Sequence, residues 1–275
     1  METAPQQITI TLPSLHPAQS EVARHSARFR VLCTGRRFGK TKLGAVLCVA
    51  AGARGQVAWW IAPTFPMAQI GFRMIKALAA QIPGVGINES TRMVYFPGGG
   101  IVQTKSADNP VSLRGEGLDL AILDECAFIA PEAWGESLRP ALSDRQGRAV
   151  FISTPNRRNW FHALWIHGTI GEPDWQSWQL PTAANPFIKP EEIEAAKRDL
   201  SEDSFRQEYL AQFLQNEGAV FRNLEACLTS TPTVASEHIK HTVVGGIDWG
   251  QVKDATAVSL FCIDCRREDV SKAEN

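Results

Sequence analysis

A lysine and a threonine stand at the end of a short glycine-containing turn early in this chain, in the segment Val31–Thr41. The segment begins as an apolar run that predicts a buried strand, and Lys40 and Thr41 open a stretch that predicts a helix. A helix N-terminus presents free N–H groups and the positive end of its dipole to phosphate oxygens, so this layout is typical of a phosphate-binding loop. In such a loop Lys40 contacts the β- and γ-phosphates, and the Thr41 hydroxyl binds Mg²⁺.

The loop departs from the strict phosphate-loop pattern, which places its first glycine at position 34. This chain has Thr34 there, and Gly35 follows one residue later. Taken alone, the segment is therefore also compatible with a tight strand-to-helix turn that carries a solvated basic patch.

Two adjacent carboxylates, Asp124 and Glu125, follow a second apolar run at 118–123. In a phosphate-loop ATPase the first acid holds the Mg²⁺ shell, and a glutamate next to it can polarise the attacking water as a general base. The alternative is a buried strand that ends in a solvated acidic turn. Downstream of a lysine loop, in a chain that alternates strands and helices, the pair favours an ATPase.

Apolar runs and helical periodicities alternate through the rest of the chain. We expect strands at 57–62, 118–124 and 149–153, a hairpin at 92–105, helices at 42–53, 159–167, 190–200 and 202–213, a helix from Ser14 or His16 to about Ser26, and a helix from Pro66 with Ile70, Met74, Ile75 and Leu78 on one face. This alternation predicts an α/β fold with a central, mostly parallel sheet covered on both faces. The aromatic residues of 159–167 are expected in the core.

Gln19 lies on the first predicted helix, just before the strand that leads into the loop. Its amide offers a donor and an acceptor, as the edge of an adenine base requires. An exposed surface glutamine is the alternative.

The composition is that of a soluble globular protein of 275 residues, with 44% hydrophobic and 21% charged residues. A net charge of −1 excludes a nucleic-acid binder that works by overall charge alone. Any contact with DNA must come from local groups such as Arg24, Arg28 and Arg30, or Arg157 and Arg158. Judged singly, these groups are more typical of solvated faces.

Six cysteines are scattered along the chain, and two of them, Cys33 and Cys48, sit in apolar runs, as in a protein of a reducing cytoplasm. Cys262 and Cys265 form a C-x-x-C without the second pair of a zinc site, and we expect them to pack in a strand. The sequence shows neither a signal peptide nor an apolar run long enough to span a bilayer.

The texture of the sequence predicts three parts. Residues 1–214 would form the ATPase domain, and the polar stretch 215–241 would be a linker. Residues 242–275 would hold two further strands, at 243–250 and 255–263, and then a charged tail.

Several motifs in order resemble the large subunit of tailed-phage terminases, the motors that pump DNA into capsids. The family's deviant Walker A is resembled by Gly35-Arg36-Arg37-Phe38-Gly39-Lys40-Thr41, and its Walker B by Ser112-Leu113-Arg114-Gly115 leading to Leu123-Asp124-Glu125. Its coupling motif is resembled by Ser153-Thr154-Pro155. The other matching segments are Pro63-Thr64 with Ala68-Gln69; Asn185-Pro186-Phe187 and Phe205–Leu210; and Gly246–Gly250 with Asp254-Ala255-Thr256. The last of these resembles the first strand of an RNase H-like nuclease. The resemblance implies a P-loop NTPase domain (ASCE, RecA-like) and a nuclease fragment.

The resemblance also assigns roles to single residues. Lys40 and Thr41 would hold the phosphates of ATP and Mg²⁺, Asp124 the metal shell, and Glu125 would be the catalytic base. The remaining assignments are Gln19 near adenine; Gly35, Arg36, Arg37 and Gly39 around the phosphates, with Arg36 also catalytic; Thr154 as a γ-phosphate sensor; and Arg114 as an arginine finger to a neighbouring subunit.

The partners implied by the resemblance are double-stranded DNA, a small terminase subunit, the capsid portal and further copies of the chain in a ring, in the cytoplasm of a bacterial host and away from membranes. Two alternatives stay open: a helicase-like nucleic-acid-dependent ATPase, and a degenerate prophage remnant without catalysis that only binds subunits or the portal. A strand like 243–250 does not normally follow a helicase core, whereas intact Lys40, Asp124 and Glu125 count against a remnant.

The nuclease part is expected to be incomplete. A two-metal nuclease needs several clustered carboxylates. Asp248, at the end of an apolar strand, is the one credible metal ligand, and Asp254 is a doubtful second. We therefore expect the chain as written not to cut DNA.

Overall fold

The computed structural model describes residues 12–214, 243–248 and 257–262. The chain divides into two compact units, Met1–Glu217 and Gly218–Asn275, which are described separately. The first unit is built on one eight-stranded sheet with the strand order β3-β4-β5-β2-β6-β7-β1-β8. Its strands are β1 (Phe29–Thr34), β2 (Val57–Ala62), β3 (Gly86–Asn88), β4 (Met93–Tyr95), β5 (Ile101–Ser106), β6 (Leu120–Asp124), β7 (Arg148–Ser153) and β8 (Trp175–Leu180).

The six neighbouring strands β5, β2, β6, β7, β1 and β8 run parallel, and β3 and β4 add an antiparallel edge. This confirms the predicted α/β class with a mostly parallel sheet. The predicted hairpin is formed by β4 and β5, with Val94 opposite Val102. The sheet's other edge strand, β8, was not predicted, because its WQSWQL sequence has neither an apolar run nor a regular alternation.

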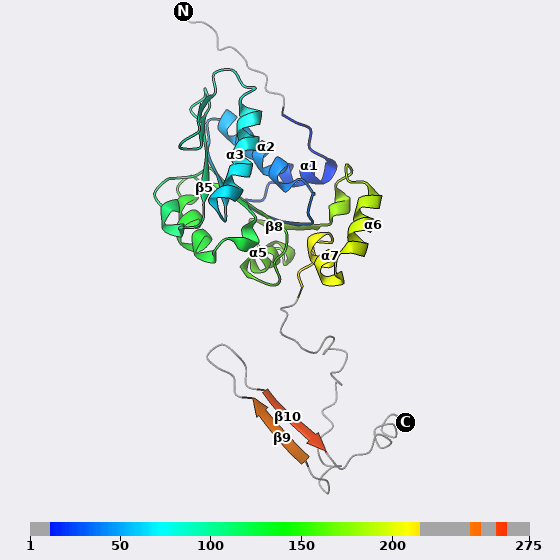
Figure 1. The fold of residues 1–275 in the computed structure, drawn as a ribbon. Helices are drawn as coiled ribbons and strands as arrows, with labels where there is room; N and C mark the ends of the chain where they lie inside the picture. Colours follow the sequence, from blue (N-terminus) through cyan, green and yellow to red (C-terminus); the bar gives the residue numbers. More distant parts are fainter. Residues whose placement is uncertain (1–11, 215–242, 249–256, 263–275) are drawn as a thin grey trace, which may run out of the picture. The chain divides into compact units, whose positions relative to one another are not determined.

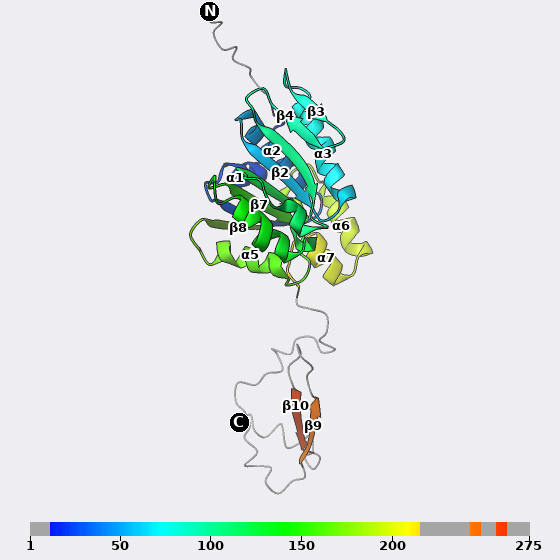
Figure 2. The same ribbon diagram turned by 90° about the vertical axis from the view of Figure 1, so that its left-hand side faces the viewer.

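Helices cover both faces of the sheet (Figures 1 and 2). The helices are α1 (Pro17–Arg24), α2 (Lys40–Ala53), α3 (Phe65–Ala79), α4 (Arg139–Ala141), α5 (Trp160–Thr169), α6 (Pro190–Asp199) and α7 (Glu202–Glu208), and Ala133–Leu138 is π-helical. One core lies between α1, α2, α3 and the sheet, and a second lies between α5 and the opposite face. Successive strand residues alternate between the two cores, since Trp60 belongs to the first and Trp59 to the second.

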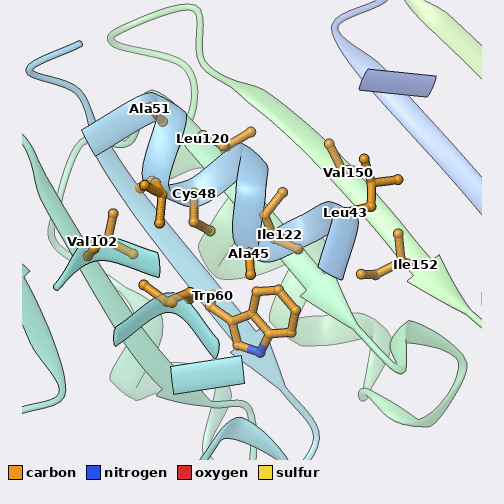
Figure 3. Packing of buried hydrophobic residues seen from close by; sticks show 14 of the residues in the cluster. Leu43, Ala45, Cys48, Ala51, Trp60, Val102, Leu120, Ile122, Val150 and Ile152 are labelled. Atoms are coloured by element: carbon orange, nitrogen blue, oxygen red, sulfur yellow. The ribbon is translucent and has the colours of Figure 1, made fainter. Parts of the chain in front are cut away.

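Helix α2 lies at the centre of the first core. Figure 3 shows its side chains above residues from four neighbouring strands: Val102, Trp60, Leu120, Ile122, Val150 and Ile152. Trp60 is fully buried between α2 and α3, where both helices present glycine. A Cβ atom on Gly71 would lie 2.2 Å from the Trp60 ring, and one on Gly44 would lie 2.6 Å from it. These glycines therefore let two helices approach one large side chain.

The apolar face predicted for α3 lies only partly in the core: Ile75 is buried, whereas Ile70 is 49% exposed. Two other expectations were wrong. Arg30 is not part of a solvated face: it is buried and donates to the carbonyl oxygens of Val22 and Ala23 at the end of α1. The last predicted helix, 202–213, ends as α7 at Glu208.

The second unit contains the two predicted strands, as β9 (Val243–Asp248) and β10 (Ala257–Cys262), which pair antiparallel with Asp248 opposite Ala257. Asp254, Cys265 and the predicted linker lie outside the described residues. Across the described segments, no helix is both long and apolar enough to cross a bilayer.

Candidate active site

The chemical groups singled out in the sequence follow three neighbouring parallel strands. The loop 35–39 follows β1, Thr154 follows β7, and Glu125 follows β6. Because the carboxyl ends of parallel strands meet at one edge of the sheet, these groups converge there. β7 lies between β1 and β6, so those two strands are separated by roughly 10 Å, or two strand spacings. That gap leaves room for phosphate groups between the loop and the acids.

Four side chains from outside the loop hold its backbone by hydrogen bonds to successive carbonyl oxygens. The oxygens of residues 36, 37, 38 and 39 pair in order with Thr182 Oγ1 (2.8 Å), Asn185 Nδ2 (2.7 Å), His16 Nε2 (3.0 Å) and Gln19 Nε2 (2.9 Å). The His16 ring also packs edge-on against the Phe38 ring. The backbone of Gly39 is left-handed, with φ of 99°, and this residue caps α2.

Carbonyls that are tied outward leave the following N–H groups directed the other way, because N–H and C=O point to opposite sides of a trans peptide. In the described part of the chain, the N–H groups of Arg37, Phe38 and Gly39 donate to no protein acceptor. The N–H groups of Lys40 and Thr41 continue the series at the start of α2, where helical N–H groups lack intrahelical partners. Such a row of free donors at a helix N-terminus fits a phosphate group.

Gly35 is not part of this row, which corrects its assignment to the phosphate cradle. Its N–H donates to the carbonyl of Leu180 at 3.0 Å. A Cβ atom at this position would lie 2.4 Å from Thr182 Oγ1 and 2.5 Å from the Tyr209 carbonyl oxygen. The glycine is therefore required by close packing against the segments after β8 and α7. The strict glycine position is held by Thr34, which is fully buried.

Lys40 and Asp124 are both buried, and the positive charge of Lys40 acts on the Asp124 carboxyl across the gap. Burial, together with the charge of the adjacent Glu125, raises the pKa of the Asp124 carboxyl to about 7, although the charge of Lys40 acts in the opposite direction. Within the described residues, Lys40 forms no ion pair and no side-chain hydrogen bond. The site thus holds a buried carboxylate and, near it, a lysine that has no direct partner among the described residues.

The donor set fits Mg²⁺. The Asp124 carboxylate and the Thr41 hydroxyl are hard oxygen ligands, and Mg²⁺ usually takes one or two protein oxygens together with phosphate oxygens and water. A buried carboxylate with a raised pKa is also a group whose charged form a cation would stabilise. No cluster of three or more potential metal ligands occurs in the described ranges, and Asp248, in the second unit, is not placed relative to these groups.

Glu125 follows Asp124 with a left-handed backbone, φ of 47°, which turns the chain out of the strand. Its side chain is half-buried. Two residues later, the N–H of Ala127 donates to Ser153 Oγ at 3.2 Å, so the end of β7 is linked directly to the segment after Glu125. Thr154, next to Ser153, is buried, and its hydroxyl makes no hydrogen bond within the described residues. The hydroxyl therefore remains available for a phosphate.

Arg36 and Arg114 both project from the surface. Arg36 is held by an ion pair with Glu208 of α7, and this pairing raises the pKa of Arg36, with a smaller contribution from Glu125. Arg37 is exposed and adopts a left-handed backbone with φ of 61°. Arg114 pairs at 2.9 Å with Glu136 of the π-helical turn, and its side chain is half-exposed. Arg114 is thus on the outside of the unit, whereas Arg36 can act on the site of its own chain.

Gln19 is 1% exposed, which excludes the alternative of an exposed surface glutamine. Both ends of its amide are used: Oε1 accepts from the His16 N–H at 3.1 Å, and Nε2 donates to the Gly39 carbonyl. The geometry makes Gln19 a support of the phosphate loop, with its base-reading groups already occupied.

Gln19→Ala is therefore expected to weaken the binding of ATP and GTP by the same factor, about two- to twelvefold for one lost hydrogen bond. Fluorescence competition with both nucleotides measures the two affinities, and Gln81→Ala, which removes an exposed glutamine in the turn after α3, is the control. A loss confined to ATP would show instead that Gln19 reads adenine.

Five supports of the site were not assigned roles from the sequence: His16, Ser153, Thr182, Asn185 and Glu208. His16 and Ser153 flank residues that were singled out, and Asn185 begins an Asn-Pro turn that marks a special backbone. Glu208 lies in the motif 205–210, and Thr182 carries no local signal; the contacts of both with Arg36 span most of the domain.

Comparison with known proteins gives a consistent set of similarities. Residues 31–226 match the family model described as terminase large subunit, T4likevirus-type, N-terminal. The large terminase subunit of Thermus virus P23-45 is 31% identical over 90% of this chain, and the chain spans 60% of that protein's length. The ATPase domain of the large terminase of Thermus phage P74-26 superposes with a TM-score of 0.64 at 30% identity, covering 73% of this chain and 94% of the domain. The large terminase of another thermophilic bacteriophage, solved in complex with ADP, shares the fold at 14% identity, with a TM-score of 0.62 over 73% of this chain and 54% of that one.

Proposed function

The chain belongs to the family of terminase large subunits, and we propose that its first unit is the ATP-hydrolysing motor domain of a viral DNA-packaging enzyme. The observation that carries this proposal is the row of free N–H groups in the loop, closed at one end by Lys40 and faced by the buried Asp124. A neutral turn or a solvated basic patch would not need four side chains to hold its carbonyls outward.

In this proposal the loop N–H groups and Lys40 bind the phosphates of ATP, and Thr41 and Asp124 hold Mg²⁺. The bound Mg²⁺ supplies positive charge that offsets the charge of the phosphates. Glu125 accepts the proton of the attacking water, and the hydroxyl of Thr154 contacts the terminal phosphate. The Ser153–Ala127 bond connects that contact to the segment of Glu125. Arg36, whose charge also interacts with Glu125, would leave Glu208 to contact the phosphates.

The wider activity is proposed from family membership. The relatives named above are terminases, and the chain spans 60% of the length of the Thermus virus protein. We propose double-stranded DNA as the substrate that is moved, a small terminase subunit and the capsid portal as partners, a ring of copies as the working assembly, and the host cytoplasm as its place of work.

The direct test is ATP turnover by the purified chain in Mg²⁺, with and without double-stranded DNA. Turnover that DNA stimulates is the expected result. An absence of turnover in a folded chain that binds ATP would contradict the proposed hydrolysis, and turnover indifferent to DNA would contradict the proposed motor.

Arg114 is expected to serve the site of a neighbouring subunit, because it is half-exposed and its ion pair in the described part of the chain is with the surface residue Glu136. Arg114→Ala and Lys40→Ala proteins each lack a different half of such a shared site. An equimolar mixture that assembles at random should therefore recover about a quarter of the parent turnover, since about a quarter of its interfaces are intact.

The mixture needs one control and one condition. Lys40→Ala mixed with the Lys40→Ala/Arg114→Ala double variant should recover nothing. If rings shown to be mixed gain no turnover, Arg114 does not act in trans, and a parent rate for Arg114→Ala alone would remove it from catalysis.

A further inference from the structure

A cavity lies where the parallel strands begin, at the end of the sheet opposite to the phosphate loop. It has a volume of about 350 Å³, within the range of roughly 300–1,000 Å³ that is typical of small-molecule sites. Its walls come from the amino ends of β1, β6 and β7 and from the carboxyl end of α2. A strand of six residues is about 20 Å long, so this cavity is distinct from the proposed ATP site.

Four arginines line the cavity: Arg30, Arg54, Arg145 and Arg148. The one carboxylate among the lining residues is Asp119, which pairs with Arg145 at 3.2 Å and also accepts the N–H of Val57. Within the described residues, Arg54 and Arg148 form no ion pair. The cavity therefore carries more positive charge than its own carboxylate offsets.

The positive charge of Arg30 is not neutralised by a carboxylate in the described part of the chain. Its side chain is buried, and one nitrogen donates to the two carbonyls at the end of α1, whereas its Nε is buried and has no hydrogen-bond partner in the described ranges. Burial, together with the positive charge of Arg148, lowers the pKa of Arg30 to about 10. A buried donor without a partner is costly and is usually explained by a ligand, an ion or water.

The carboxyl ends of α1 and α2 also face this region, and each contributes roughly half a negative charge. With Asp119 they offset about two of the four arginine charges. About two positive charges remain, more than one carboxylate would neutralise. Guanidinium groups form paired hydrogen bonds with phosphate oxygens, and several of them around one cavity are typical of phosphate recognition.

We propose that this arginine-lined cavity binds phosphate oxyanions, either a free phosphate or diphosphate or the backbone phosphates of a nucleic acid. The site does not depend on the proposed ATP hydrolysis. Arg28, which donates to the carbonyls of Leu142 and Gly147, shapes the wall that Gly147 lines. Of the arginines that the sequence marked as a candidate DNA contact, Arg30 lines the cavity.

The test uses the whole chain with Lys40→Ala, so that the phosphate loop does not dominate binding. The site variant is Arg54→Gln/Arg148→Gln, whose side chains are exposed and unpaired in the described part of the chain, so that the fold should tolerate the change. Arg73→Gln/Arg198→Gln removes the same charge from exposed positions elsewhere and is the matched control. Equal melting temperatures verify that both variants are folded.

Calorimetric titration with inorganic diphosphate, and anisotropy of a short labelled DNA duplex at several salt concentrations, distinguish the two sources. If the ligand is a free oxyanion, the site variant should bind diphosphate at least about tenfold more weakly, and the control should not. If the ligand is a nucleic acid, the slope of log K against log salt for the duplex should be shallower than that of the control, by the amount expected for about two lost phosphate contacts. If the site variant matches the control with both probes, the proposal is wrong.

Discussion

Lys40→Ala is expected to lower ATP turnover by about 10²–10³-fold or more, the usual effect of losing one preorganised charge at a phosphate or oxyanion site. Lys40 is buried at the first turn of α2 and, within the described residues, has neither an ion pair nor a hydrogen bond. Only the longer-range charge of Asp124 acts on it within the described residues, so no direct partner has to be displaced before it can contact ATP. Nucleotide binding should weaken as well, because the lysine contacts ATP before the reaction begins.

The matched control is Lys42→Ala, two residues along the same helix. Lys42 donates to the carbonyl of Ser14 at 2.9 Å and points away from the row of free N–H groups. Steady-state turnover and nucleotide titration of both variants separate a specific effect from a general loss of positive charge. If both lysine variants lose activity equally, or if Lys40→Ala retains the parent rate, the phosphate loop has been assigned to the wrong residues.

Glu125→Gln is expected to abolish turnover by about 10²–10⁴-fold, the range for a general base, while nucleotide binding stays close to that of the parent. Glutamine keeps the size of the side chain and its hydrogen-bonding capacity but cannot accept the proton of water. The variant leaves Asp124 in place, so the metal shell should persist. Single-turnover mixing, followed by the amount of nucleotide retained, measures both properties on one sample.

Two comparisons give this prediction its meaning. Asp124→Asn removes the proposed Mg²⁺ ligand and should weaken nucleotide binding in Mg²⁺ as well as turnover. Glu132→Gln, at an exposed position before the π-helical turn, should change neither. Hydrolysis by Glu125→Gln at the parent rate would mean that the base lies elsewhere.

The two predictions rest on different parts of the fold. Lys40 is placed by the loop, which four outside side chains hold, whereas Glu125 is placed by β6 and by the link from Ser153. A variant of one part should therefore leave the geometry of the other part unchanged, and it should not shift the melting temperature of the domain. This independence allows a loss of turnover to be attributed to chemistry.

The sequence by itself determined the order of the elements and the reacting groups. The loop, Lys40, Thr41 and the Asp124–Glu125 pair are local patterns, each complete within about ten residues, and their strands are buried apolar runs that few other structures fit. The neighbouring strands bring these groups to one edge because parallel strands end together. The α/β fold and the position of these groups in it could thus be predicted.

Only the tertiary structure decided what holds these groups in place. Thr182 reaches a loop carbonyl 146 residues away in the sequence, and Asn185 reaches its neighbour across 148 residues. Gly35 looks like a phosphate glycine but is required by packing against Thr182 and Tyr209. Contacts of this kind leave no period or spacing in the sequence, because each depends on how distant segments fold against one another.

The same reason explains Arg30, which the sequence places in a surface cluster and the fold buries under α1. Its charge contributes to the arginine-lined cavity because the fold brings Arg148 close to it from the neighbouring strand β7. Local patterns therefore determined which chemistry this protein can carry, whereas long-range packing decided how the phosphate loop is held and created the second, arginine-lined cavity.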